Sequence, residues 1–221
     1  MPRKRAAPWL LPLAALGLGA ALVRYGREPL SRAMESMHQS SMPSARLYDL
    51  VATPALERFY RRVAREAVSL SSTGAALDVG CGPGGLAIRL AEEAPGLQVT
   101  GMDVSPEMVE LAGRRVAAAG LAGRVDFRVG AAEAMPFPDG RFDLVVSTLS
   151  LHHWPDAEAG LAEVHRVLKL GGQACIYDVP RWLSHLEMRK PGLAGLADGS
   201  TLETVWRIGP IPVLIKVCVR K

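Results

Sequence analysis

The chain has 221 residues, of which 49% are hydrophobic, enough for the core of one domain of ordinary size plus an appendage. Its 26 basic and 22 acidic side chains give a formal net charge of +4, and Arg3, Lys4 and Arg5 contribute three of those charges. Because the remainder is nearly neutral and its arginines alternate with acids, the composition does not indicate a nucleic-acid-binding surface.

Residues 1–23 form the first predicted element, a basic start followed by the uncharged stretch 6–23. This pattern is typical of a signal peptide, a signal anchor or a short membrane helix, and the stretch has about the minimum length that spans a bilayer. We expect a retained membrane anchor. Cleavage near Leu18, Gly19 and Ala20 is the alternative, and an anchor lying in the plane of the membrane also remains open.

Residues 24–70 predict a linker and N-terminal cap helices. The stretch 24–52 is mixed, with serines and prolines that break up short helical patterns. Thr53 followed by Pro54 is typical of a helix start, because a hydroxyl suits the N-cap and proline suits the first helical position. Apolar residues follow at helical spacing as far as Ala67, while the arginines face elsewhere, toward solvent or toward anionic lipid headgroups.

Residues 71–221 alternate between predicted strands and helices. Strands are expected at 75–79, 97–103, 124–129, 142–148 and 173–177, and helices at 85–92, 105–119 and 156–168, the last ended by Gly171 and Gly172. This order predicts a parallel sheet with helices on both faces. Two further β-rich runs, 201–208 and 213–219, surround Gly209 and Pro210 and predict a terminal hairpin.

A glycine-rich loop connects the first of these strands to its helix. Gly80, Gly82 and Gly84 follow the apolar strand and Asp78 directly. Glycines let the backbone approach a ligand closely, and the free N–H groups of a helix start meet its polar atoms. The spacing predicts a nucleotide-type cofactor site. It also fits a dinucleotide pattern, so an NAD-dependent oxidoreductase remains an alternative.

The three cysteines, Cys81, Cys175 and Cys218, are far apart in the sequence. Their odd number and wide spacing predict buried or loop thiols in a reducing compartment rather than a disulfide framework. No set of histidines, cysteines and carboxylates has metal-ligand spacing, so we expect no metal.

Five motifs together resemble the class I S-adenosylmethionine-dependent methyltransferases, in the branch that acts on small molecules and lipid quinones. They are DVGCGPG (78–84), GMDVSPEM (101–108), EAMPFP (133–138), FDLVV (142–146) and LKLGG (168–172). The resemblance runs from about Ala75 to Asp178. It implies an α/β fold with a Rossmann-like, seven-stranded, mostly parallel sheet, helices on both faces and an antiparallel hairpin at the C-terminal end.

The resemblance also implies S-adenosyl-L-methionine as the cofactor and a set of residues that bind it. Asp78 would orient the amino end of the cofactor, the glycines would let the backbone approach its methionine and ribose parts, and Asp103 would accept hydrogen bonds from the ribose hydroxyls. The full set implied is Asp78, Gly80, Cys81, Gly82, Gly84, Asp103, Val104, Ala131, Ala132 and Ser147.

The adenine end departs from the family pattern. Relatives carry an acid just after the third strand, whereas this chain has Ala131, whose side chain accepts no hydrogen bond. Backbone groups of Ala131 and Ala132, or the carboxylate of Glu133, are left to bind the adenine amino group. Val104 would supply apolar contact to the ring, with packing in the core as its alternative role.

His152 follows the strand 142–148, at the edge of the sheet where ligands bind in open α/β folds. An imidazole there suits a general base for an oxygen or nitrogen nucleophile. The alternative is that His152 and His153 only pack, cap or face solvent.

The sequence therefore predicts a methyltransferase that acts on a small or lipid-like acceptor. Because S-adenosylmethionine is made in the cytosol, we expect the chain at a membrane surface with its catalytic domain facing the cytoplasm. A non-catalytic, methyltransferase-like binding module is a further alternative, which the alanine at position 131 keeps open. Neither the methyl acceptor nor the oligomeric state follows from the sequence.

Overall fold

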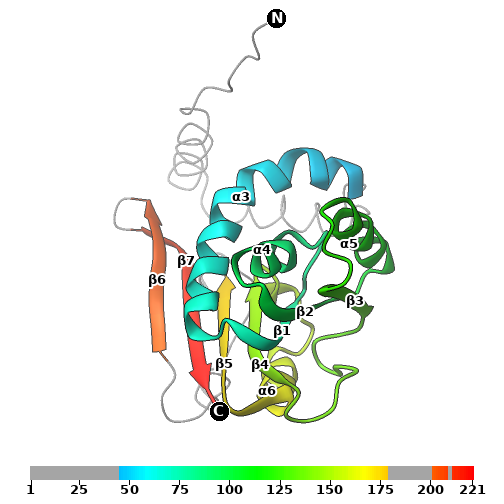
Figure 1. Ribbon diagram of the computed structural model, residues 1–221. Coiled ribbons are helices and arrows are strands. Elements are labelled where there is room, and N and C mark those ends of the chain that lie inside the picture. The colour runs from blue at the N-terminus through cyan, green and yellow to red at the C-terminus, as the bar shows by residue number, and fades with distance from the viewer. Residues whose placement is uncertain (1–44, 179–200, 209–210) are drawn as a thin grey trace, which may run out of the picture. The chain divides into compact units, whose positions relative to one another are not determined.

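The strand that leads into the glycine loop is an interior strand of a seven-stranded sheet in the computed structural model, with two strands on one side of it and four on the other (Figure 1). The structure describes residues 45–178, 201–208 and 211–221. The strands follow the spatial order β3-β2-β1-β4-β5-β7-β6. Their bounds are Thr73–Val79 (β1), Gly96–Asp103 (β2), Val125–Val129 (β3), Phe142–Thr148 (β4), Leu168–Asp178 (β5), Thr201–Ile208 (β6) and Ile211–Arg220 (β7).

The first five strands are parallel to one another, and the last two form an antiparallel hairpin whose β7 pairs with β5. The mostly parallel sheet and the terminal hairpin are therefore confirmed. The strand order reverses direction between β1 and β4, because β2 and β3 lie on one side of β1 and the later strands on the other. Ligands of open α/β sheets bind at the carboxyl ends of the strands at such a point.

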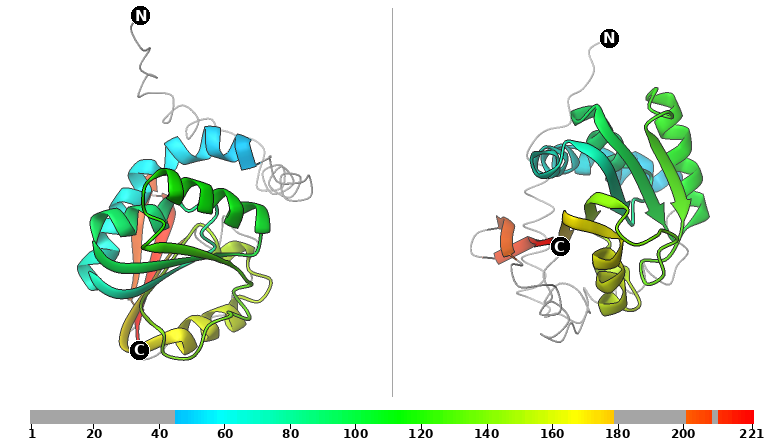
Figure 2. Two further views of the ribbon diagram at one scale, coloured as in Figure 1. Left: turned by 45° about the vertical axis from the view of Figure 1, so that its right-hand side comes forward. Right: turned by 60° about the horizontal axis from the view of Figure 1, so that its bottom comes forward.

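Helices cover both faces of the sheet, as predicted (Figure 2). The helices α3 (Ala45–Leu70), α4 (Gly85–Glu93) and α5 (Pro106–Ala118) lie on one face, and α6 (Ala157–Val167) lies on the other after the short 3₁₀ helix η1 (Leu151–His153). Side chains alternate between two cores along β5, where Ala174 and Ile176 join the α6 side while Cys175 and Tyr177 join the α3–α4 side. Burial on both faces explains why the interior strand β4 is largely apolar.

Two of the described helices start with a polar side chain as the cap. The hydroxyl of Ser105 accepts a hydrogen bond from the N–H of Met108 at 3.3 Å, and Pro106 opens α5. The carboxylate of Asp156 accepts one from the N–H of Ala159 at 2.9 Å at the start of α6. Both caps pair backbone donors that a helix start leaves open.

The prediction of a helix start at Thr53 and Pro54 is wrong. Helix α3 begins at Ala45 and runs through both residues to Leu70. Proline lacks an N–H and its ring crowds the carbonyl four residues earlier, yet the helix continues through Pro54. Residues 1–44, with the predicted anchor 1–23, lie outside the described residues, so the proposed division of the N-terminal region stays a prediction.

The prediction that Gly171 and Gly172 end helix α6 is also wrong. The helix ends at Val167, and β5 begins at once with Leu168. The two glycines instead lie in an irregular part of β5, where the N–H of Gly171 donates to the carbonyl of Lys221 at 2.8 Å and the N–H of Lys221 donates to the carbonyl of Gly172 at 3.0 Å. They therefore fasten the last described strand to the sheet.

The prediction of three free thiols holds only for the buried Cys81. Cys175 and Cys218 form a disulfide although 43 residues separate them. They lie directly opposite each other where β5 and β7 pair. Facing positions of antiparallel strands bring side chains close together, and the sequence shows no sign of this pairing until the strand order is known.

The described residues contain no helix long and apolar enough to cross a membrane.

Candidate functional site

The glycine loop is shaped by backbone hydrogen bonds to the end of β2. The N–H groups of Gly80 and Cys81 both donate to the carbonyl of Met102, at 2.8 and 3.0 Å. Gly80, Gly82 and Gly84 all have positive φ angles, of 69°, 50° and 79°. L residues with side chains rarely adopt such angles, so the path of this loop requires glycine at all three positions.

The three glycines differ in what surrounds them. A Cβ on Gly80 would collide with the side chain of Ser150, and one on Gly84 would lie 2.9 Å from the ring of Phe127. A Cβ on Gly82 would meet no atom within 4 Å. Gly80 and Gly84 therefore permit close packing within the protein, whereas Gly82 is where the loop backbone is open to a ligand.

Asp78 is a buried carboxylate at the end of β1, with 1% of its surface exposed. Neither of its oxygens has a hydrogen-bond partner among the described residues. Burial, and secondarily the charge of Asp103, raises the pKa of Asp78 to about 7. The backbone N–H of Ala87 lowers the pKa of Asp78 in part, but this N–H is not placed to form a hydrogen bond with the carboxylate. A buried acid without a partner is suited to a ligand that brings a cation or N–H donors.

Ser147, on the neighbouring strand β4, is fully buried, and its hydroxyl also lacks a partner among the described residues. The pairing of β1 with β4 places Val79 beside Ser147 and Asp78 beside Val146. Two unpaired polar groups of adjacent strands thus lie near the same carboxyl edge of the sheet.

Asp103 connects the glycine loop with the loop after β2. Its Oδ2 accepts a hydrogen bond from the N–H of Gly82 at 2.8 Å, and its Oδ1 accepts one from the N–H of Ser105 at 2.9 Å. Each carboxylate oxygen can accept a second hydrogen bond, so the side chain can hold the loop and also accept hydroxyl donors. The structure thus gives Asp103 a positioning role that the sequence did not indicate.

The segment after β3 lies beside Asp103, because the N–H of Gly130 donates to the carbonyl of Asp103 at 3.0 Å. Ala131 and Ala132 follow directly. Glu133, the alternative acid for adenine, accepts a hydrogen bond from the N–H of Asp156 at 3.2 Å and so turns toward the start of α6. This leaves the backbone of the two alanines as the polar groups nearest to this end of the site.

Val104 is 72% exposed next to Asp103. The alternative that it packs in the core is therefore wrong. Its neighbour Met102 is buried in the core instead. An exposed valine beside the ribose-binding candidate is available for contact with a planar ligand.

His152, in η1, forms two hydrogen bonds with Asp178 at the end of β5. Its Nδ1 lies 2.6 Å from Oδ1 of Asp178, and its backbone N–H donates to Oδ2 at 2.9 Å. The two hydrogen bonds fix the ring and leave Nε2 as the nitrogen that can take up a proton. The ring of the exposed His153 lies against it, with centroids 3.8 Å apart. A held His152 beside an exposed His153 also fits the alternative in which one histidine packs and the other is exposed, so the role of His152 as a base stays a prediction.

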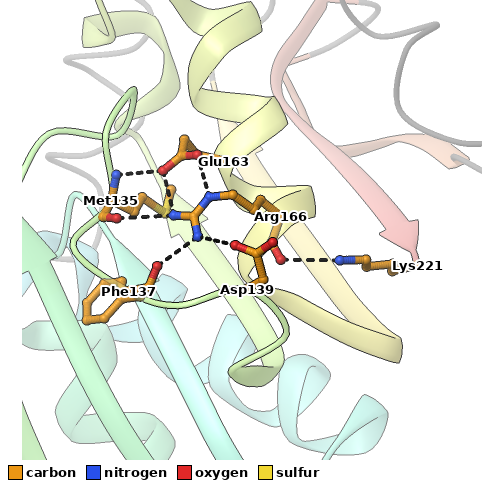
Figure 3. Close-up of polar contacts among 6 residues, drawn as sticks. All are labelled: Met135, Phe137, Asp139, Glu163, Arg166 and Lys221. Atoms are coloured by element: carbon orange, nitrogen blue, oxygen red, sulfur yellow. Dashed lines mark hydrogen bonds and ion pairs between the residues drawn. The ribbon is translucent and has the colours of Figure 1, made fainter.

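Two residues of the region escaped the sequence analysis. Asp178 is an acid at the carboxyl end of a strand next to β4, and that position was a usable signal. Arg166 of α6 binds the segment that follows Ala132 through two backbone carbonyls, those of Met135 and Phe137 (Figure 3). Nothing in the local sequence pattern distinguishes it from a solvent-exposed arginine of an amphipathic helix.

The sequence model of the methyltransferase domain family matches residues 76–172, from within β1 to the paired glycines of β5. This chain carries a class I S-adenosylmethionine-dependent methyltransferase domain. The glycine loop, Asp78 and Asp103 all lie in the matched segment, so the methyltransferase domain accounts for the pattern that also suited an NAD-dependent oxidoreductase.

Two curated relatives act in quinone metabolism by name. The ubiquinone/menaquinone biosynthesis C-methyltransferase UbiE of Geotalea daltonii is 33% identical over 153 residues, covering 68% of this chain and 65% of the relative. The demethylmenaquinone methyltransferase of Deinococcus radiodurans is 33% identical over 154 residues, covering 70% and 63%. The chain thus spans slightly less than two thirds of the length of these relatives.

Solved structures share the fold. A putative S-adenosylmethionine-dependent methyltransferase from Methanococcus maripaludis has a TM-score of 0.64 at 22% identity, covering 80% of this chain and 91% of that one. The [4+2]-cyclase SpnF has a TM-score of 0.53 at 34% identity, covering 57% and 46%. A similar chain described as a cyclase shows that the fold alone does not determine the reaction.

Asp78→Asn tests the buried carboxylate. We expect the variant to bind S-adenosylhomocysteine at least about 10-fold more weakly, because a charge-assisted hydrogen bond to the ligand ammonium is lost. Without ligand it should be more stable than the wild type at pH 8, because no charge is then buried unpaired. Isothermal titration and thermal melting measure the two effects.

The pH dependence follows from the raised pKa. The ligand-free wild type loses stability as pH rises from about 4 to about 7, because only the unfolded Asp78 ionises freely there, whereas the Asn variant lacks this loss. Wild-type affinity should rise from pH 6 to 7.5, where the ligand ammonium stays protonated. Asp126→Asn, on the edge strand β3, is the matched control. Equal affinity in wild type and Asp78→Asn would contradict the assignment.

Proposed function

We propose that this protein transfers a methyl group from S-adenosylmethionine to a small quinol- or phenol-type acceptor. The observation that supports this most directly is the buried, unpaired carboxylate of Asp78 next to open loop backbone at Gly82. The names of the quinone-methylating relatives suggest the class of acceptor.

The residues present fit the cofactor. Asp78 would bind its ammonium group, Asp103 its ribose hydroxyls, and Val104 the face of its adenine. The backbone of Ala131 and Ala132 would meet the adenine edge, and Gly82 would allow close approach of the methionine part. When bound, the cofactor supplies an activated methyl group on a positively charged sulfur. The protein then has mainly to align acceptor and donor.

Four more residues belong to the candidate site: Gly80, Gly84, Cys81 and Ser147. The first two shape the loop by allowing close packing. The Cys81 amide is already bound to the carbonyl of Met102, so this residue supports the loop from within the core. The unpaired hydroxyl of Ser147 is suited to bind the cofactor or the acceptor at the end of β4.

His152 would act as the general base. A quinol ring carbon becomes a stronger nucleophile when the neighbouring hydroxyl loses its proton. Nε2 of His152 would accept this proton, while Asp178 holds the ring at Nδ1 and stabilises the imidazolium that results. The need for a base fits an acceptor with an acidic hydroxyl better than one with a free amine.

Residues 1–23 would attach the protein to a membrane, with the methyltransferase domain on the cytoplasmic side. The basic start and the uncharged stretch 6–23 support this proposal, as does the lipid character of quinones. The segment lies outside the described residues.

A non-catalytic binding module is the second candidate. It is favoured by Ala131, where relatives have an acid. This candidate predicts cofactor binding without methyl transfer.

A turnover assay decides between the two. The full chain is incubated with S-adenosylmethionine and either a short-chain demethylmenaquinol or a catechol, and the products are identified by mass spectrometry. We expect methylation of a ring carbon of the quinol. Submicromolar binding of S-adenosylhomocysteine without turnover on either acceptor would favour the binding module instead.

His152→Gln should lower kcat by about 100-fold or more, because general base catalysis contributes about 10²–10⁴-fold. The affinity for S-adenosylhomocysteine should stay unchanged. Asp178→Asn should lower kcat by a smaller factor, because the ring is still present but no longer held by a carboxylate.

His153→Gln is the matched control for the proposed base, since His153 is its exposed neighbour. It should keep nearly full activity. If His152→Gln and His153→Gln behaved alike, a base at position 152 would be ruled out.

Membrane attachment is tested on the full chain by flotation with vesicles of mixed neutral and anionic lipid. We expect the wild type to float with the vesicles and a variant with Leu10, Leu11 and Leu13 changed to Asp to remain behind, because charges oppose insertion into hydrocarbon. Flotation of both proteins, or of neither, would contradict an anchor in residues 1–23.

A further inference from the structure

The segment between β3 and β4 is bound from the side by one arginine. Arg166 of α6 uses all the N–H groups of its guanidinium (Figure 3). Nη2 donates to the carbonyl of Met135 at 3.1 Å, and Nη1 donates to the carbonyl of Phe137 at 2.8 Å and to the carboxylate of Asp139 at 2.7 Å. Nε and Nη2 also bind both oxygens of Glu163, at 2.6 and 2.8 Å.

Glu163 completes the arrangement by binding the same segment. Its Oε2 accepts a hydrogen bond from the N–H of Met135 at 2.8 Å, so the pair holds both the donor and the acceptor of one residue. The hydrogen bonds from Arg166 lower the pKa of Glu163, which keeps the pair charged at neutral pH. The carbonyl of Arg166 accepts hydrogen bonds from the N–H of Gly140 and from Nζ of Lys221, at 3.0 and 3.2 Å.

These contacts fix the turn that contains Ala131 and Ala132 from both ends. On one side, the N–H of Gly130 is bound to the carbonyl of Asp103. On the other side, Arg166 and Glu163 hold Met135, the residue directly after the turn. Within the turn, the N–H of Ala134 donates to the carbonyl of Ala131 at 3.3 Å.

An alanine at position 131 increases the importance of this support. An acidic side chain could adjust its rotamer to meet the adenine amino group, but backbone groups have no such freedom. Their position must be set before the ligand arrives, or part of the binding free energy is lost in ordering the turn.

We propose that Arg166, together with Glu163, is a positioning residue for adenine recognition, holding the backbone of Ala131 and Ala132 where it binds the 6-amino edge of the ring. The inference rests on the proposed use of S-adenosylmethionine. It assigns nucleobase specificity to an ion pair that does not itself touch the ligand.

The test compares two ligands, S-adenosylhomocysteine and S-inosylhomocysteine. The second has an oxygen in place of the 6-amino group, which inverts the donor and acceptor pattern of that edge. We expect the wild type to prefer the adenosyl ligand by about 10-fold or more, the effect of one or two hydrogen bonds. In Arg166→Gln, the Kd for the adenosyl ligand should rise about 10-fold and the preference should fall to about twofold.

Three further variants complete the design. Arg166→Lys keeps the charge but lacks the planar set of N–H donors of a guanidinium. Its preference for the adenosyl ligand should therefore lie between those of the wild type and Arg166→Gln. It replaces the Gln variant in the test if that variant does not fold. Glu163→Gln should reduce the preference in the same direction. Arg141 is an exposed arginine just beyond the segment that Arg166 binds. Arg141→Gln is therefore the matched control and should leave both dissociation constants unchanged.

The preference between the ligands separates positioning from general stability, because a loss of stability alone weakens both ligands equally. An unchanged preference in both Arg166 variants would overturn the inference, whatever happens to Tm. A wild type that binds both ligands equally would overturn it too. A wild type that binds neither ligand would contradict the proposed function itself.

Discussion

A buried carboxylate that has no partner among the described residues, at the end of the interior strand β1, is the constraint on which the site depends. Strand β1 has neighbours on both sides, and its pairing places Gly101 and Val146 beside Asp78. Neither residue offers a side-chain donor to the acid. The protein therefore retains an unfavourable charge, visible in the raised pKa of Asp78, which a cationic ligand can relieve. Stability without the ligand is sacrificed for affinity, as is common at functional sites.

The loops around this carboxylate are organised by the end of β2. One carbonyl, that of Met102, takes two N–H groups of the glycine loop, and the neighbouring Asp103 takes a third from Gly82. Strand, loop and acid thus hold one another in place before any ligand binds. Such preorganisation matters for a reaction in which alignment supplies most of the rate.

Local patterns predicted the parts of the fold that depend on local interactions. The bounds of β4 and the helix starts near Ser105 and Asp156 follow from apolar runs and polar residues a few positions apart. The same is true of the glycine loop, although its residues looked equivalent in sequence. Only the neighbours of each Cβ separate Gly82 from Gly80, because those neighbours come from distant segments.

The missed features all involve partners that are far apart in the chain. Asp178 lies 26 residues from His152, and Arg166 reaches 31 residues back to Met135. The disulfide between Cys175 and Cys218 depends on which strand pairs with β5. The longer α3 was missed for another reason, since a proline of the kind that is typical of a helix start lies here inside the helix.

The contacts of β7 bear on the order in which the protein can assemble during synthesis. Lys216 of this strand binds Glu66 of α3 at 2.8 Å across 150 residues, and Lys221 binds the backbone of β5 and the carbonyl of Arg166. The contact between α3 and β7, and the contact of Lys221 with the carbonyl of Arg166, can therefore form only once these last described residues have left the ribosome. Until then the nascent chain exposes an unpaired edge of β5, which is the stage at which chaperones would be most needed.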